Sequence, residues 1–296
     1  MDTRMRGKGG IGTYITQLSE RLNLESLHFR APIYSIREQL GYPFQVPACD
    51  IFFSPHMNVP LLPTRAKMRI TTVHDVYHLD QGQHYPLRKR LAVKQLYKRA
   101  ILGSDLVITV SAFSKERILH YFPKARVEMI HLGADHLLGI EPKEVHGVPK
   151  QYYLFVGTGK LHKNRRLLEG LPVVDVMGQY NEAELVWLYK HAKALIFPSL
   201  YEGFGLPPLE AMSLGCPVVA SDAASIPEVC GDAALYFDPH ERKDLERVLE
   251  ILDGQSSHLV EQGLKRASAF DWNQCVKRHD TLFALSRDQN DLLRVP

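Results

Sequence analysis

The stretch that decides the fold is "ALIFPSLYEGFGLPPLEAMSLG", residues 194–215. Its first six residues predict a β-strand, "LYEGFG" predicts a loop at the carboxyl end of that strand, and "PPLEAMSLG" predicts a helix. Proline favours the first turn of a helix and glycine favours its end. Parallel α/β sheets are built from such strand–loop–helix units, and their ligands bind at the carboxyl ends of the strands.

Two carboxylates flank this loop. Glu202 lies in the loop and Glu210 in the first or second turn of the helix, so both are expected to point at one ligand. An acid near a helix start also complements the helix dipole, which accounts for Glu210 but not for Glu202. Carboxylates accept paired hydroxyl hydrogen bonds, which suits a sugar or a ribose, and the amides of residues 203–205 can approach an anionic oxygen closely.

The same alternation extends along the chain and predicts parallel sheets covered by helices. The strand-like runs are residues 50–55, 69–75, 105–111, 126–133, 151–157, 194–199, 216–221 and 234–239. Residues 136–150 contain two prolines and two glycines and are interpreted as an interdomain linker. We therefore expect Rossmann-like domains at 1–138 and 150–271. The helical pattern from about residue 258 to 288 suggests closing helices, and a C-terminal helix at 272–296 is expected to pack on the first domain.

The composition is typical of a globular protein with two domains. With 296 residues, 45% hydrophobic content and 23% charge, the chain has room for two globular domains. Its net charge of +3 does not favour nucleic acid as a partner. The four cysteines lack CxxC spacing, and neither a signal region nor a membrane span is recognisable, so we expect a cytoplasmic protein.

Two glycine-bearing loops precede predicted helices. Gly9, Gly10 and Gly12 stand before an amphipathic helix, where backbone amides form an anion site or a simple turn. In the second half, the strand at 151–157 leads through a glycine loop to a helix expected to begin near Asn164. His162 and Lys163 follow the carboxyl end of this strand, where a cation could bind a diphosphate. The alternative is that they form a solvated basic turn.

The run "SLYEGFGLPPLEAMSLGCPVVASDAASIPEVCGDAALYFDP", residues 199–239, resembles the donor-binding signature of retaining glycosyltransferases of the GT-B fold, family four. Weaker similarities follow in the family's order: "GGIG" near the start, "TVHDV" at 72–76, "VSAFSK" at 110–115, "IHLGAD" at 130–135 and "VGTGKLHKN" at 156–164. The resemblance implies two Rossmann-like domains facing a cleft. The motifs that carry this resemblance extend over most of the chain.

The resemblance also implies roles for matching residues. Glu202 is similar to the acid that contacts the transferred sugar, beside the amides of Gly203, Phe204 and Gly205, and Glu210 to the acid that holds the ribose. Lys163 matches the residue that binds the diphosphate, whereas many relatives have arginine at His162. His74 resembles a first-domain histidine near the sugar. Gly9, Gly10 and Gly12 resemble the loop that closes on diphosphate and acceptor.

The chemistry implied is transfer of a hexosyl group from a nucleotide diphosphate sugar, with retention, to a saccharide or lipid-linked acceptor. The chain has no DxD sequence, so we expect no metal. "VGTGKLHKN" and "TVHDV" look most like mannosyltransferases of bacterial surface-polysaccharide assembly, which makes GDP-mannose the first expected donor. A glycosidase acid pair and a phosphorylase are weaker alternatives.

The chain also departs from the family pattern. Relatives have another strand and helix between the equivalents of "NRRLLEG" and "VVDVMGQYNEAEL", and here only Leu171 and Pro172 separate them. This departure keeps a non-catalytic nucleotide-sugar binding module as the main alternative to an enzyme.

Residues 86–100 contain six cations and no acid. Arg90, Lys94 and Lys98 recur every four positions, which predicts a basic helix face opposite Val93, Leu96 and Ala100. This face is either solvated or contacts anionic lipid or a lipid-diphosphate acceptor at the inner membrane surface.

Isolated histidines and one cysteine are read more simply. The histidines at 56, 78 and 84 are interpreted first as structural, with the acceptor side as the alternative, and Cys216 as a small buried apolar residue.

Overall fold

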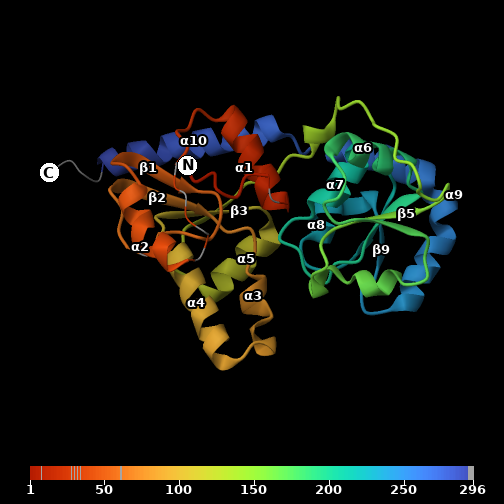
Figure 1. Ribbon diagram of the computed structural model, residues 1–296, viewed down its shortest axis with the longest axis horizontal. Helices are drawn as coiled ribbons and strands as arrows, with labels where there is room; N and C mark the ends of the chain where they lie inside the picture. Colours follow the sequence, from red (N-terminus) through yellow and green to blue (C-terminus); the bar gives the residue numbers. More distant parts are fainter. Residues whose placement is uncertain are drawn as a thin grey trace. The chain divides into compact units, whose positions relative to one another are not determined.

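The computed structural model describes residues 1–292 except positions 8, 28, 30, 32, 34 and 61, and describes side chains to residue 287. The chain divides into two compact units (Figure 1). The first unit comprises Met1–His131 and the chain from Asn273 onward, and the second comprises Leu132–Trp272. The segment interpreted as a linker, 136–150, therefore belongs to the second unit.

The first unit contains a parallel sheet with the order β1-β2-β3-β4. Its strands are β1 (Cys49–Ser54), β2 (Ala66–Thr72), β3 (Leu106–Thr109) and β4 (Val127–Met129). The helices are α1 (Gly9–Arg21), α2 (Ile36–Gln45), α3 (Tyr77–Asp80), α4 (Leu87–Leu102), α5 (Ala112–Tyr121) and α10 (Trp272–Leu292), with a 3-10 turn η1 at Gly82–His84. Side-chain caps begin two of them: Ser35 accepts from the Glu38 amide, and Ser111 accepts from the Ser114 amide.

The second unit contains a parallel sheet with the order β6-β5-β7-β8-β9. Its strands are β5 (Tyr153–Val156), β6 (Val173–Val176), β7 (Ala194–Phe197), β8 (Val218–Ser221) and β9 (Leu235–Phe237). The helices are α6 (Glu182–His191), α7 (Leu206–Ser213), α8 (Ile226–Cys230) and α9 (Arg242–Ala267). Short 3-10 turns lie at Asp135–Leu137 (η2), Leu161–Lys163 (η3), Arg165–Leu168 (η4) and Gly231–Ala233 (η5).

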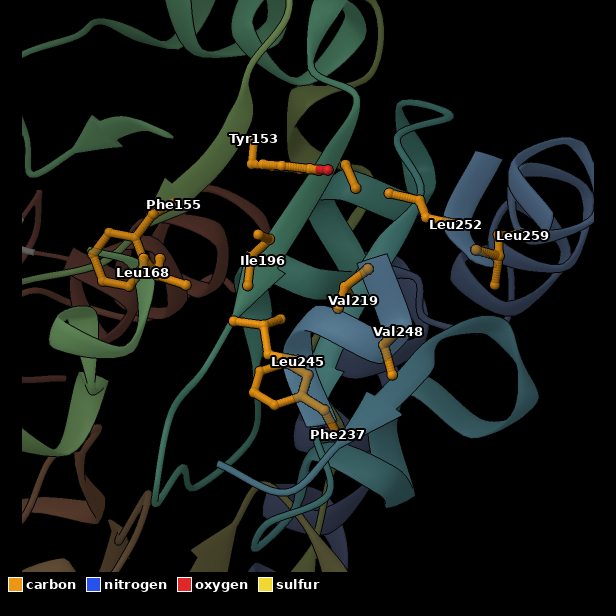
Figure 2. Packing of buried hydrophobic residues seen from close by; sticks show 11 residues of the cluster. Tyr153, Phe155, Leu168, Ile196, Val219, Phe237, Leu245, Val248, Leu252 and Leu259 are labelled. Atoms are coloured by element: carbon orange, nitrogen blue, oxygen red, sulfur yellow. The ribbon is translucent and has the colours of Figure 1, made fainter. Parts of the chain in front are cut away.

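Helix α9 covers one face of this second sheet. Its buried leucines and valine pack against alternate strand residues, among them Phe155, Ile196 and Val219 (Figure 2). Alternation of this kind places every second residue of a strand on the same face. The opposite-facing residues of the same strands, including Leu154 and Leu195, are also fully buried, as expected for a parallel sheet with both faces covered.

The connection after β5 differs from the sequence prediction. We expected a helix from about Asn164, and the structure has the two 3-10 turns η3 and η4 there instead. Asn164 between them is left-handed, with φ 53°, and Gly170 has φ 83°. These positions interrupt regular helical geometry, so the chain passes quickly into β6. The prediction did not include β6, which pairs with β5 as an edge strand.

Candidate donor site

The strand order of the second unit fixes where a ligand would bind. From β5 the chain passes to β6 on one side, and then returns to β7 on the other side of β5. The order reverses between β5 and β7, and open parallel sheets bind ligands outside the carboxyl ends of strands at such a switch point. The loop with Lys163 follows β5 and the loop with Glu202 follows β7.

The structure brings Lys163 and Glu202 together. Lys163 Nζ donates to Glu202 Oε1 at 2.6 Å, although the residues are 39 positions apart. Both side chains are mostly buried, with 16% and 13% of their surface exposed. Two further contacts hold the lysine loop. The Leu200 amide donates to the His162 carbonyl at 2.7 Å, and Asn164 Nδ2 donates to the Pro239 carbonyl at 2.7 Å.

A buried serine, Ser225, holds the loop of residues 202–205 through its hydroxyl group. Ser225 Oγ lies within hydrogen-bonding distance of two carbonyls, those of Glu202 at 3.0 Å and Phe204 at 2.8 Å. Gly205 then begins α7 with φ 114°, a backbone conformation that L side chains rarely adopt. The glycine at this position is therefore required by the sharp entry into the helix.

Glu210 lies in the second turn of α7 and is 7% exposed. Its Oε2 accepts a hydrogen bond from Tyr189 OH at 2.8 Å, and its Oε1 lies 3.3 Å from His136 Nε2. Burial raises the pKa of Tyr189 well above its usual range, and the charge of Glu210 raises it further, so the tyrosine hydroxyl keeps its proton. Glu210 was predicted as a site residue from the sequence, whereas neither of these partners was.

The predicted residues of the first unit also lie near one another. Gly9, Gly10 and Gly12 form the first turn of α1, rather than a loop before it. A Cβ on Gly12 would lie 2.9 Å from the Gly7 backbone, so the turn before α1 packs closely on this helix. One turn further along, the Tyr14 ring meets the His74 ring edge to face, with centroids 5.0 Å apart.

His74 follows β2 and is half-buried. Its Nε2 donates to the Pro55 carbonyl at 3.0 Å. Desolvation lowers the pKa of His74 to about 4, against the opposing effect of that hydrogen bond, so the imidazole is neutral at physiological pH. A neutral imidazole at this position is a hydrogen-bonding group rather than a cation for phosphate.

A second buried histidine, which sequence reasoning missed, lies close to these residues. His279 on α10 donates from Nδ1 to the Cys275 carbonyl at 2.8 Å, and its Nε2 lies 2.7 Å from Tyr14 OH. Because Nδ1 carries the proton, Nε2 accepts from the tyrosine. Thr72 Oγ1, at the end of β2, is 2.9 Å from the same hydroxyl. The chain thus ties α1, β2 and α10 together beside His74.

Comparisons with known proteins identify a known family in each half of the chain. Residues 143–263 match the family described as Glycosyl transferases group 1, and residues 48–136 match Glycosyltransferase Family 4. The chain belongs to the GT-B glycosyltransferases. Expectations of family, fold class and enzyme class made from the sequence are confirmed.

Relatives of this glycosyltransferase include mannosyltransferases. It is 29% identical over 301 residues to O-antigen chain mannosyltransferase B of Escherichia coli, covering 84% of this chain and 76% of the relative. It is 26% identical over 235 residues to O-antigen chain mannosyltransferase RfbU of Salmonella typhimurium, covering 67% and 63%. With the serotype-specific mannosyltransferase WbdA of Escherichia coli it shares 40% identity over 98 residues, which span only 12% of WbdA.

Solved structures resemble this glycosyltransferase in fold. A glycosyltransferase from Rickettsia africae ESF-5 has a TM-score of 0.62 at 14% identity, covering 93% of this chain and 88% of the other. Sucrose-phosphate synthase from Thermosynechococcus elongatus has a TM-score of 0.59 at 20% identity, covering 76% and 68%. At these identities the likeness shows the shared fold alone.

The basic segment of this glycosyltransferase forms α4, and its faces differ in part from the prediction. Ala100 is buried and Val93 is half-buried, as predicted, but Leu96 is exposed. Tyr97 and Ile101 provide the buried side instead. The reason is the helical register, because positions 93, 97, 100 and 101 share one face.

The remaining histidine and cysteine interpretations concern packing. His56 is buried, accepts the Asn58 amide at Nδ1, and places Nε2 3.2 Å from Asp2 Oδ2, as a structural histidine would. His78 is exposed and contacts the Tyr85 hydroxyl, and His84 is exposed. Cys216 is buried as predicted, and burial raises the pKa of its thiol to about 12.

None of the helices in the part of the chain that the structure describes is both long and apolar enough to cross a membrane. No three metal-ligating side chains gather there in a group that could hold a metal ion.

Proposed function

We propose that this glycosyltransferase transfers a hexosyl group, with mannose as the first candidate, from a nucleotide diphosphate sugar to a saccharide or lipid-linked acceptor in surface-polysaccharide assembly. The two O-antigen mannosyltransferases that match most of the chain support mannose and this process. GDP-mannose is accordingly the first donor to test.

The contact between Lys163 and Glu202 carries the proposal. In a sugar nucleotide, the sugar and the diphosphate are joined through a single oxygen, so groups that bind them must lie close together. The ammonium and the carboxylate are 2.6 Å apart at the switch point of the sheet. We assign Lys163 to the diphosphate and Glu202 to the sugar hydroxyls, with His162 and the amides of residues 203–205 beside them. Glu210 is assigned to the ribose.

Transfer would proceed without a protein base. Breaking the sugar–phosphate bond leaves positive charge on the sugar ring and negative charge on the diphosphate, and Lys163 stabilises the latter. The acceptor's hydroxyl oxygen bonds to the anomeric carbon from the face that the diphosphate leaves. At the same time, a phosphate oxygen of the leaving diphosphate takes the proton of that hydroxyl. The reaction therefore retains configuration. His74 and the glycines of α1 are assigned to the sugar and acceptor side.

A donor panel tests the activity. GDP-mannose, UDP-glucose and dTDP-glucose, each labelled in the sugar, are incubated with the enzyme and polysaccharide acceptors in the presence of EDTA. We expect labelled product from GDP-mannose, with the anomeric configuration of the donor by NMR. Nucleotide binding without transfer from any donor would instead support the non-catalytic module, and loss of transfer in EDTA would contradict metal independence.

We also propose that α4 places the enzyme at an anionic membrane surface. The helix carries six exposed cations and no acid, and Leu87 and Leu91, one turn apart, are 69% and 54% exposed. Apolar side chains among cations on one exposed helix suit a bilayer interface, where leucines enter the headgroup boundary and cations meet anionic lipid.

Vesicle sedimentation tests the membrane proposal. Vesicles with phosphatidylglycerol should bind the protein, and those of phosphatidylcholine alone should not. The triple substitution of Arg90, Lys94 and Lys98 by glutamine should reduce binding, since each cation near such a surface contributes about 1 kcal/mol. A control triple on α9 removes the same charge from Lys243, Arg247 and Lys265. Equal binding by both triples would refute the role of α4.

A further inference from the structure

Glu210 is held by an arrangement that the ribose assignment alone does not explain. The two carboxylate oxygens meet different side chains, Tyr189 OH at 2.8 Å and His136 Nε2 at 3.3 Å. These groups come from α6 and from the turn η2, so two separate elements of the second unit converge on a carboxylate carried by a third, α7. Only 7% of the glutamate is exposed.

The histidine tautomer follows from its second nitrogen. Trp272 Nε1 lies 3.2 Å from His136 Nδ1, and an indole N–H can only donate. His136 Nδ1 is therefore the acceptor, so the ring proton is on Nε2, which faces Glu210. The tryptophan thus fixes which nitrogen donates, as second partners do for metal-binding histidines.

The segment that carries His136 is itself anchored. The Trp272 amide donates to Asp135 Oδ1 at 2.9 Å, and the Ala134 amide donates to the Phe270 carbonyl at 3.0 Å. A Cβ added to Gly133 would lie only 2.3 Å from the Trp272 backbone nitrogen, so the backbone at Gly133 and the backbone at Trp272 are in close contact. His136 therefore has little freedom to turn away from the carboxylate.

Each carboxylate oxygen has two acceptor positions, and one donor occupies one position on each. One position per oxygen remains, and a pair of neighbouring hydroxyls on a ligand could use both. Holding the carboxylate in one orientation before the ligand arrives removes part of the ordering cost of binding.

We infer that His136 and Tyr189 are positioning residues, which orient Glu210 to accept the 2′- and 3′-hydroxyls of the nucleotide ribose. The inference rests on the proposed ribose role of Glu210. It adds that affinity for the ribose hydroxyls depends on two residues that do not contact the nucleotide.

Nucleotides with and without these hydroxyls separate positioning from simple structural support. Affinities of GDP and 2′,3′-dideoxy-GDP are measured by calorimetry for wild type, Tyr189→Phe and His136→Phe. We expect each substitution to weaken GDP about tenfold, equivalent to about 1.4 kcal/mol, and to leave dideoxy-GDP unchanged. His136→Gln, which keeps a side-chain N–H donor, should recover part of the GDP affinity.

A matched control distinguishes loss of a buried hydroxyl from loss of this particular one. Tyr152 is buried in the same unit, and its hydroxyl donates to the Leu188 carbonyl at 2.9 Å. Tyr152→Phe should leave both affinities unchanged. If Tyr189→Phe and His136→Phe weaken both nucleotides equally, or neither, the positioning role is wrong.

Glu210→Gln identifies which idea has failed. If this variant weakens GDP selectively while the Tyr189 and His136 variants do not, the ribose role stands and the positioning inference is overturned. If Glu210→Gln weakens GDP and dideoxy-GDP equally, the ribose role itself is wrong, and the inference is overturned with it.

Discussion

The buried histidine on α10 should make the stability of the protein depend on pH between 7 and 5. His279 is fully buried, and its two nitrogens are engaged by the Cys275 carbonyl and the Tyr14 hydroxyl. Desolvation lowers its pKa to about 4, and the charge of Arg278 adds to this effect, against the opposing hydrogen bond to Cys275. The same imidazole in the unfolded chain titrates at its ordinary value of 6.5.

The sign and size follow from linkage. Below pH 6.5 the unfolded state binds a proton that the folded state does not, so acid favours unfolding. The contribution of His279 is fully present above pH 6.5 and is lost as the pH falls toward 4. With these two pKa values, the free energy of unfolding drops by about 2 kcal/mol between pH 7 and pH 5, taking 1.36 kcal/mol per pKa unit.

Urea unfolding followed by circular dichroism at several pH values measures this loss. His279→Gln removes the titrating ring but keeps a side-chain oxygen that can accept from Tyr14. Its free energy of unfolding should fall by about 2 kcal/mol less than that of wild type between pH 7 and 5. Tyr14→Phe is the control, since it removes a hydrogen bond but leaves the imidazole buried, so the pH dependence should remain. An unchanged pH dependence in His279→Gln would refute the argument.

Three further changes test other parts of the structure. Gly133→Ala should destabilise the second unit by about 1–3 kcal/mol in urea unfolding, because its Cβ would overlap the Trp272 backbone. Asn181→Ala should cost about 1 kcal/mol by removing the cap of α6, and Asn181→Asp should not. Lys163→Gln should lower kcat about 100-fold by removing the cation assigned to the diphosphate. Lys160→Gln, an exposed neighbour, should leave kcat unchanged.

Much of the fold could be predicted from local patterns. The strand–loop–helix of residues 194–215 was predicted correctly because its signals are local: an apolar run, a loop with glycines, and prolines at the helix start. The α-helix expected after Asn164 was wrong, and β6 was missed, for a related reason. Asn164 has a left-handed backbone conformation, and β6 follows it within ten residues. The few polar residues of this segment carry no pattern that predicts either feature.

The site was predictable only in part. Glu202 and Lys163 were predicted as site residues from their motifs, and the structure adds the contact between them. His136 was overlooked because it lies in a segment that looked like a linker, and because the tryptophan that fixes its ring is 136 residues away in the sequence. A contact of that range leaves no periodicity in the chain.

The two acids of the site are held in different ways, and this difference suits different parts of one ligand. Glu202 is paired with a cation, Lys163, whose three N–H donors allow it to keep the carboxylate and also meet a phosphate oxygen. Glu210 is held by neutral donors, which orient the carboxylate without cancelling its charge. A diphosphate would therefore find its cation beside Glu202, and neutral hydroxyls would find an uncompensated acceptor at Glu210. Exchanging the two environments would place a cation at the ribose and leave the diphosphate facing an unpaired carboxylate, which Coulomb repulsion opposes.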